Sequence, residues 1–208
     1  MKSLEYKVIS TGSKGNAVVI GDILIDCGVP FKKLKEHLYD IKTLLITHRH
    51  GDHVKESTLK NIIMMYLHIK IFLNYDVAQW LTEFPINVVN AGFPFLTDNQ
   101  IVITPFECLH DVVCHGYVWS VNGERIIYAT DTVDLRNAPE GHYDYFFIES
   151  NYDTTKLLNM AARGKFGYNV VAGAKRHMST QTCKAFYYMN RRDQESKLIE
   201  LHMSGRFY

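Results

Sequence analysis

The side chains best suited to chemistry in this chain lie in the segment Thr47–His53, which holds three histidines and an aspartate. An apolar run precedes the segment, so we expect a loop at the end of a strand. Imidazole and carboxylate groups bind zinc and similar divalent ions. Because alternate residues of an extended loop point the same way, His48 and His50 can bind one ion. Asp52 and His53 can reach a second ion. The alternative is a surface histidine cluster without metal, which would require this ordered set to arise by chance.

The composition is that of an ordinary soluble globular protein, with 47% hydrophobic and 22% charged residues. A chain of 208 residues can bury one substantial core, so we expect a single domain over residues 1–208. The net charge of +1 and the pI near 7.7 predict no strong basic surface. Binding to long nucleic acid is therefore neither required nor excluded.

The cysteines and the apolar runs indicate the cellular compartment in which we expect the protein. The four cysteines form no CxxC pair, which is typical of reduced, buried thiols in an intracellular protein. The N-terminus shows no signal segment, and no apolar run approaches the roughly 20 residues that span a bilayer. We expect a cytoplasmic protein with no membrane partner. The oligomeric state stays open, and a homodimer is compatible with the sequence.

Two groups of strands, each followed by helices, must position these residues. The first group predicts strands at Tyr6–Ser10, Ala17–Ile20, Ile23–Asp26, Ile41–Thr47 and Ile69–Asn74, and helices at Phe31–Tyr39, Lys55–Leu67 and Val77–Thr82. The second predicts strands at Asn87–Asn90, Gln100–Glu107, Gly116–Val121, Arg125–Thr130, Tyr145–Glu149 and Lys197–His202, and helices at Lys156–Ala162 and Thr180–Asn190. Gly21-Asp22 and Asn122-Gly123 predict hairpin turns. The pattern favours an α/β fold in which two sheets pack face to face with helices outside, an αββα sandwich.

Several separated segments together resemble the metallo-β-lactamase superfamily. Thr47–His53 is similar to its His-x-His-x-Asp-His signature. Its other motifs are matched in chain order by Ile23–Gly28, His110-Asp111, Ala129–Thr132 and Ile199–Ser204. A narrower resemblance, to the short exonuclease-like members of bacteria and their phages (the YycJ/WalJ type), lies in Gly12–Asn16, Ile148–Asp153 and Arg176–Ser179. The resemblance runs from residue 8 to residue 204 and implies the superfamily's αββα sandwich of two mixed β-sheets flanked by helices.

The resemblance implies two divalent metal ions, with zinc favoured and manganese as the alternative. The implied ligands are His48, His50 and His110 for the first ion, and Asp52, His53 and His202 for the second. Asp131 would bridge the ions, because a carboxylate can donate one oxygen to each. Asp52 is also expected to take part in catalysis. The expected nucleophile is a hydroxide between the ions.

His177 and His202 divide two further roles. His202 ends a predicted strand, where the superfamily's last ligand projects, so we assign it to metal. In RNase Z-like phosphodiesterases the loop histidine equivalent to His177 approaches the scissile phosphate and can protonate the leaving oxygen. We therefore assign His177 to acid catalysis or phosphate binding, with the reverse assignment as the alternative. Lys175-Arg176 replaces the usual glycine before this histidine with a basic residue.

Other residues are expected to support the centre. Asp26 is expected to hydrogen-bond the backbone of the metal loop and so fix the ligands, the alternative being a plain turn residue. Ser13 and Asn16 lie on a Gly-flanked turn that either contacts phosphate or is a simple hairpin turn. Asn151 follows a predicted strand and either supports a ligand or stabilises a loop.

These motifs predict a dinuclear metal-dependent phosphodiesterase that acts on nucleic acid, DNA or RNA. One alternative is a phosphodiesterase of small cyclic nucleotides, of the phage anti-defence type, which the short chain and near-neutral charge favour. A second is a thioester or lactam hydrolase, against which the segments Glu149–Asp153 and His177–Ser179 argue. A third is a binding module without catalysis. The intact ligand set argues against that module, because buried carboxylates and histidines are costly without metal.

Overall fold

The structure is a computed structural model that describes residues 4–162 and 168–205. By its internal contacts the chain divides into two compact units. Unit 1 comprises Met1–Pro105 and Val112–His115, and unit 2 comprises Phe106–Asp111 and Gly116–Tyr208. That both belong to one domain stays a prediction.

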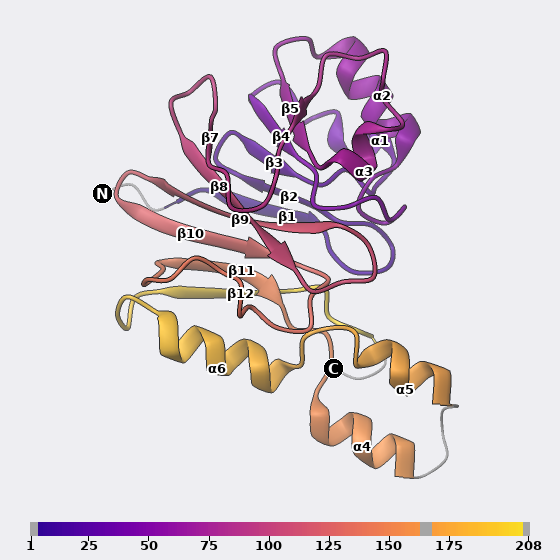
Figure 1. Ribbon diagram of the computed structural model, residues 1–208, viewed down its shortest axis with the longest axis vertical. Coiled ribbons are helices and arrows are strands. Elements are labelled where there is room, and N and C mark those ends of the chain that lie inside the picture. Colours follow the sequence, from indigo (N-terminus) through magenta and orange to yellow (C-terminus); the bar gives the residue numbers. More distant parts are fainter. Residues whose placement is uncertain (1–3, 163–167, 206–208) are drawn as a thin grey trace. The chain divides into compact units, whose positions relative to one another are not determined.

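A six-stranded sheet forms the frame of unit 1, in the order β1-β2-β3-β4-β5-β6 (Figure 1). Its strands are β1 Tyr6–Ser10, β2 Ala17–Ile20, β3 Ile23–Ile25, β4 Thr43–Leu45, β5 Lys70–Leu73 and β6 Asn87–Val88. The pairs β1–β2 and β2–β3 are antiparallel, whereas β3, β4, β5 and β6 run parallel. The connections contain helices α1 Phe31–Leu34, α2 Glu56–Met65 and α3 Tyr75–Ala78.

Helix α2 shows how the sequence builds the core of unit 1. Leu59, Ile62 and Ile63 recur at helical spacing and are buried, while Asn61 and Met64 are exposed. One face of the helix is therefore apolar and turns inward. These residues join a buried cluster with side chains from β3, β4 and β5. Strands β3 and β4 are buried along their whole length, so they lack the alternation of buried and exposed residues, as buried parallel strands do.

The second sheet has the order β12-β11-β10-β9-β8-β7 (Figure 1). Its strands are β7 Phe95–Leu96, β8 Val102–Cys108, β9 Cys114–Val121, β10 Glu124–Ala129, β11 Tyr145–Glu149 and β12 Lys197–Leu201. Strands β10, β11 and β12 are parallel neighbours, and β9 is antiparallel to β10. Helix α6 Thr180–Asn190 packs on β11, and α4 Thr154–Ala162 and α5 Tyr168–Ala174 precede it in the chain.

These two mixed sheets and their flanking helices confirm the predicted fold class. Both predicted hairpin turns are present, at Gly21-Asp22 between β2 and β3 and at Asn122-Gly123 between β9 and β10. Asn122 and Gly123 have φ values of 53° and 83°. Positive φ at both central residues is what a type I′ hairpin turn requires.

Predicted element bounds were correct for four elements, namely Tyr6–Ser10, Ala17–Ile20, Tyr145–Glu149 and Thr180–Asn190. The helix predicted at Phe31–Tyr39 ends at Leu34, because the residues after it form turns. There the backbone N–H of His37 donates to the carbonyl of Leu34, only three residues back, at 2.8 Å. The strand predicted from Gln100 begins at β8, because Gln100 has φ 61° and cannot extend.

Local causes explain three further differences. The helix predicted at Val77–Thr82 covers Tyr75–Ala78, because Asn74 caps it by accepting a hydrogen bond from the Val77 N–H at 3.2 Å. Strand β7 was not predicted, since two residues are too few for an alternating pattern. Helix α5 was not predicted either, because its glycine and two valines are weak helix formers.

Candidate metal centre

The carboxyl ends of three parallel strands of unit 1 carry polar residues. Asp26 directly follows β3, Thr47 lies two residues after β4, and Asn74 directly follows β5. Because these strands are parallel neighbours, their ends lie at one edge of the sheet, which is where open α/β sheets place their ligand sites. Asn74 Nδ2 donates to the Thr47 carbonyl at 3.1 Å. The fold therefore delivers the loop Thr47–His53, the metal loop below, to a polar edge.

Asp26 ties the start of the metal loop to its end. Its Oδ1 accepts hydrogen bonds from the Thr47 N–H at 2.9 Å and from the Thr47 hydroxyl at 3.0 Å. Its Oδ2 lies 2.7 Å from His53 Nδ1. Burial raises the pKa of Asp26, against the opposing effects of His53 and Thr47. Asp26 thus lies where it can fix the ring of His53, the positioning contact that carboxylates provide to metal-binding histidines.

His48 and His50 present their ring nitrogens to each other. His48 Nε2 and His50 Nδ1 are 3.2 Å apart. On the other side of the His48 ring, Nδ1 lies 3.0 Å from the Thr47 hydroxyl and 3.6 Å from Cys114 Sγ. Two nitrogens bound to one tetrahedral zinc ion at about 2.0–2.1 Å would be about 3.4 Å apart. The pair therefore has the spacing of two ligands of one ion.

The Gly12–Asn16 turn supports the metal loop through Asn16. Asn16 Oδ1 accepts from the Gly12 N–H at 2.7 Å, while Nδ2 donates to the Asp52 carbonyl at 3.1 Å and lies 2.8 Å from His53 Nε2. Ser13, at the tip of the same turn, is exposed. The turn is thus more than a hairpin connection, because its buried asparagine reaches two predicted ligands.

Gly28 lets the backbone of the metal loop approach closely. A Cβ atom at Gly28 would lie 1.7 Å from the Asp52 carbonyl oxygen and 2.7 Å from the His53 nitrogen. The neighbouring Cys27 N–H donates to the His53 carbonyl at 2.8 Å. Only glycine fits a backbone contact this close.

Unit 2 repeats this arrangement at the carboxyl ends of β10, β11 and β12. Asp131 lies two residues after β10, Glu149 ends β11, and His202 directly follows β12. The three strands are parallel neighbours, so their ends share one edge. All three side chains are buried. His202 Nε2 is 3.7 Å from Asp131 Oδ2, and His177, on the loop before α6, has its Nδ1 3.4 Å from Asp131 Oδ1.

Glu149 holds the two histidines of this edge. Its Oε1 lies 2.7 Å from His177 Nδ1 and 3.0 Å from His202 Nδ1. Its Oε2 accepts from the Thr132 N–H at 2.9 Å and from the Met178 N–H at 3.4 Å. Each ring is therefore fixed through Nδ1, which leaves Nε2 for a metal ion or a substrate.

The charges in this cluster stabilise one another. Burial by itself would raise the pKa of Glu149, but the hydrogen bonds with His177 and His202 outweigh it and lower the pKa. Burial would likewise lower the pKa of His177, but the hydrogen bond with Glu149 and the negative charges of Glu149 and Asp131 together outweigh it and raise the pKa. The carboxylate and the imidazolium forms are both favoured by this contact.

His110 and Asn151 join the same edge of unit 2. The segment before His110 is held against the Asp131 loop, because Thr132 Oγ1 accepts from the Leu109 N–H at 3.0 Å. The rings of His110 and His177 have centroids 6.2 Å apart. Asn151 Nδ2 donates to the His202 carbonyl at 2.8 Å, and its N–H donates to the Met178 carbonyl at 2.9 Å. Asn151 thus connects the strand end of His202 to the loop of His177.

Three of these residues have an unusual backbone. Asp26, Asp131 and His202 have φ values of 62°, 54° and 54°. A non-glycine residue in the left-handed region is uncommon and costs about 1–3 kcal/mol, and such residues gather at functional sites. The same conformation ends the predicted strands Ile23–Asp26 and Lys197–His202 one residue early.

The donor groups of each unit fit divalent metal. In unit 2, one donor atom each from Asp131, Glu149, His177 and His202 lie within 4.8 Å of one another. In unit 1, the facing nitrogens of His48 and His50 have the spacing derived above. Imidazole with carboxylate is the donor chemistry of zinc and manganese sites.

Sequence reasoning missed Glu149 and Asn74 as functional residues. Glu149 follows the apolar run Tyr145–Ile148, and a carboxylate at the end of such a run is costly to bury without partners. That signal could have identified it. Asn74 carried no comparable signal, because an asparagine before a helix is an ordinary cap.

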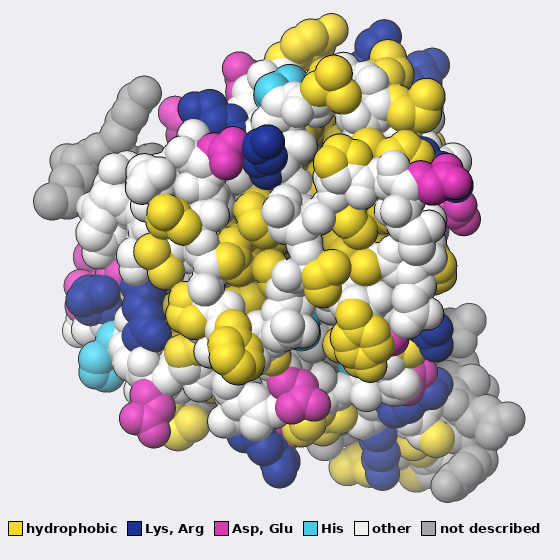
Figure 2. All heavy atoms as spheres, turned by 45° about the horizontal axis from the view of Figure 1, so that its top comes forward, with side chains coloured by type: hydrophobic (Ala, Val, Ile, Leu, Met, Phe, Trp, Pro, Cys, Tyr) yellow, Lys and Arg dark blue, Asp and Glu magenta, His cyan; other side chains and the backbone are white. Residues whose placement is uncertain are grey.

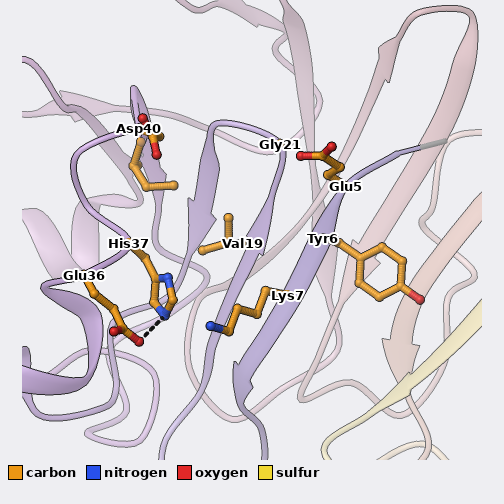
Figure 3. A pocket seen from close by; sticks show the side chains of 9 residues that line it. Glu5, Tyr6, Lys7, Val19, Gly21, Glu36, His37 and Asp40 are labelled. Carbon is orange, nitrogen blue, oxygen red and sulfur yellow. Dashed lines mark ion pairs between the residues drawn. The ribbon is translucent and has the colours of Figure 1, made fainter. Parts of the chain in front are cut away.

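A pocket of about 410 Å³ lies elsewhere in unit 1 (Figure 3). Its lining includes Lys7 of β1, Val19 of β2, and Glu36, His37 and Asp40 from the segment after α1. Figure 3 marks the ion pair in which His37 Nε2 is 3.3 Å from Glu36 Oε1. None of the predicted site residues lines this pocket.

The surface carries no dominant charge on the face shown in Figure 2, where Lys and Arg side chains alternate with Asp and Glu around gathered hydrophobic ones. This mixture agrees with the net charge of +1. Within residues 4–162 and 168–205, the helices are all too short or too polar to cross a membrane.

Comparison with known proteins places these observations in a family. The model of the beta-lactamase superfamily domain matches residues 22–182. The chain is also 22% identical to the exodeoxyribonuclease YycJ of Bacillus anthracis over 188 residues, which covers 80% of this chain and 69% of the relative.

Solved structures show the same fold. The metallo-beta-lactamase fold protein YhfI from Bacillus subtilis matches with a TM-score of 0.72 and 16% identity, covering 97% of this chain and 87% of that one. The short form of human tRNase Z matches with a TM-score of 0.68 and 19% identity, covering 97% of this chain and 93% of that one.

Proposed function

Because the chain belongs to the beta-lactamase superfamily and is a metal-dependent hydrolase, we propose that it cleaves phosphodiester bonds of nucleic acid with two divalent ions. The observation that carries the proposal is the cluster around Glu149, in which His177 and His202 both lie beside Asp131. When bound, the two ions would activate water and stabilise the attacking and leaving oxygens of an in-line displacement. Zinc is our first choice and manganese the second.

The proposed ligands follow the superfamily motifs. They are His48, His50 and His110 for one ion, Asp52, His53 and His202 for the other, and Asp131 for both. Asp26 would hold His53 through Nδ1, and Glu149 and Asn151 would hold His202.

We assign His177 to the leaving group. Its side chain is 23% exposed, so it can contact a substrate, and Glu149 binds its Nδ1 at 2.7 Å. A histidine bound through Nδ1 can give the proton on Nε2 to the departing oxygen. DNA is the favoured substrate, because the curated relative is an exodeoxyribonuclease.

A second candidate is a phosphodiesterase of small cyclic nucleotides. The net charge of +1 supports it, because long nucleic acids are usually bound by strongly basic surfaces.

The test is a substrate panel with metal analysis. Protein loaded with zinc or with manganese is incubated with single-stranded DNA, duplex DNA, RNA and 3′,5′-cyclic nucleotides. We expect about two ions per chain and cleavage of DNA or RNA. Consumption of cyclic nucleotides alone would favour the second candidate, and loaded protein that cleaves none of the four would refute both.

Asp131→Ala is the first variant for this panel. This variant should retain less metal than a variant that lacks any one of the histidine ligands, because we propose Asp131 as the ligand shared by both ions. It should also lose hydrolysis. Asp193→Ala is the matched control, since Asp193 is an exposed carboxylate of unit 2 outside the cluster. If Asp131→Ala keeps both ions and near-normal rates, the bridging role is wrong.

A further inference from the structure

Arg176 stands at the edge of the candidate centre in unit 2. It directly precedes His177, and its side chain is 66% exposed, with Nη1 3.6 Å from Asp111 Oδ2. Asp111 Oδ1 lies in turn 3.2 Å from His110 Nε2. The ring centroids of His110 and His177 are 6.2 Å apart. The guanidinium is therefore separated from the histidines by a single carboxylate side chain.

The guanidinium of Arg176 is held less tightly by protein acceptors than the guanidinium groups of Arg136 and Arg192. Arg136 donates to Asp134 through Nε at 3.0 Å and Nη2 at 2.6 Å. Arg192 Nε donates to Asp144 at 2.7 Å. Within the described part of the chain, the Arg176 guanidinium contacts a protein acceptor in the 3.6 Å pair with Asp111, which exceeds hydrogen-bond distance.

An ion pair of this kind is easily exchanged. Both side chains are exposed to water, at 66% for Arg176 and 46% for Asp111, and such pairs contribute about 0–1 kcal/mol. A phosphate group offers more, because arginine binds it through two parallel charge-assisted hydrogen bonds. A phosphate of the substrate can therefore take the place of Asp111.

We propose that Arg176 binds a second phosphate group of the substrate, adjacent to the phosphate that is cleaved. The inference rests on the proposed function and narrows its substrate class. A substrate with two or more phosphates, such as an oligonucleotide, can use this contact, whereas a cyclic mononucleotide with one phosphate cannot. Arg176 is a binding residue, and no bond forms or breaks at it.

The experiment compares substrates that differ by one phosphate. Metal-loaded wild type and Arg176→Gln are assayed on bis(p-nitrophenyl) phosphate and on a thymidine dinucleotide without terminal phosphate, with a 5′-phosphate and with a 3′-phosphate. Wild type should prefer one phosphorylated dinucleotide. Arg176→Gln should raise KM for that dinucleotide by roughly 10-fold, with kcat little changed, since it removes charge-assisted hydrogen bonds from the bound substrate. The rates on the other substrates should stay the same.

Two variants distinguish phosphate binding at Arg176 from a nonspecific effect of positive surface charge. Arg136→Gln removes an exposed arginine whose guanidinium is already bound by Asp134, so it should not change the preference. Arg176→Lys should restore part of it, because lysine keeps the charge and loses the two parallel bonds. If wild type shows no preference, or if Arg176→Gln slows all substrates equally, the inference is wrong.

Calorimetry distinguishes failure of this site from failure of the proposed function. Binding of thymidine 3′,5′-bisphosphate and of thymidine 5′-monophosphate is measured for wild type and Arg176→Gln. If no diester is cleaved and the bisphosphate still binds in an Arg176-dependent way, the phosphodiesterase proposal fails and the phosphate site stands. If bisphosphate binding does not depend on Arg176, the site fails whatever the enzyme cleaves.

Discussion

Glu149 organises the histidines of unit 2 through a single carboxylate. Oε1 contacts His177 and His202, and Oε2 accepts two backbone N–H groups, so all four contacts need an acceptor. Glutamine has the same shape but replaces one oxygen with an NH2 group, which cannot accept. Whichever way the amide turns, its NH2 group faces either the two histidine rings or the two backbone N–H groups, and those groups then lack an acceptor.

We therefore expect Glu149→Gln to weaken metal binding or activity by roughly 10–100-fold, the usual cost of losing a partner that orients metal ligands. Metal per chain after dialysis against limiting zinc, together with the rate on the best substrate, measures the effect. Glu200→Gln is the control, because Glu200 lies on β12 in the same unit and its Oε1 accepts from the Ser150 hydroxyl instead. Normal metal content and rate in Glu149→Gln would show that the histidines position themselves.

The metal loop is an element whose shape depends on a neighbouring backbone. The segment from Asp26 to Gly28 runs beside it, with contacts from Asp26 to Thr47 and from Cys27 to His53. At Gly28 the two backbones approach so closely that no side chain fits between them. Ligand positions in this loop are thus set partly by a residue without a side chain.

Gly28→Ala should displace the loop, because its Cβ would lie 1.7 Å from the Asp52 carbonyl oxygen. We expect a loss of stability of about 1–3 kcal/mol, as for other overpacked sites, together with reduced metal content. Thermal unfolding of the chelated protein and metal analysis measure the two effects. Gly51→Ala is a sharp control in the same loop, since a Cβ there meets nothing within 4 Å. If both variants have the same stability and metal content, the close approach at Gly28 does not determine the position of the metal loop.

Elements could be predicted from the sequence where one signal decided the outcome. Alternating or continuous apolar runs gave β1, β2 and β11 their bounds, and the helical spacing of α6 gave its bounds. The ends of β3 and β12 could not be predicted, because the left-handed backbone of Asp26 and His202 comes from tertiary contacts. The contacts of Glu149 could not be predicted either, since its histidine partners are 28 and 53 residues away, although its position after an apolar run could have marked it as a candidate.

At the scale of the whole molecule, folding stability should depend on pH through His115. This histidine is buried in unit 1, and burial lowers its pKa from 6.5 to about 4. The unfolded chain therefore binds the proton first as the pH falls. The stability that comes from the neutral buried ring is fully present above about pH 6.5 and is lost as the pH falls toward 4, a loss of at most about 3 kcal/mol.

His115→Gln removes this titration, so the free energy of unfolding of wild type relative to the variant should decrease as the pH falls from 8 to 4.5. Urea unfolding of the chelated proteins at several pH values measures the difference, and chelation keeps metal release out of the comparison. His142→Gln is the control, because His142 is exposed. A difference between wild type and His115→Gln that is the same at pH 8 and pH 4.5 would show that His115 carries its proton as readily in the folded chain as in the unfolded one.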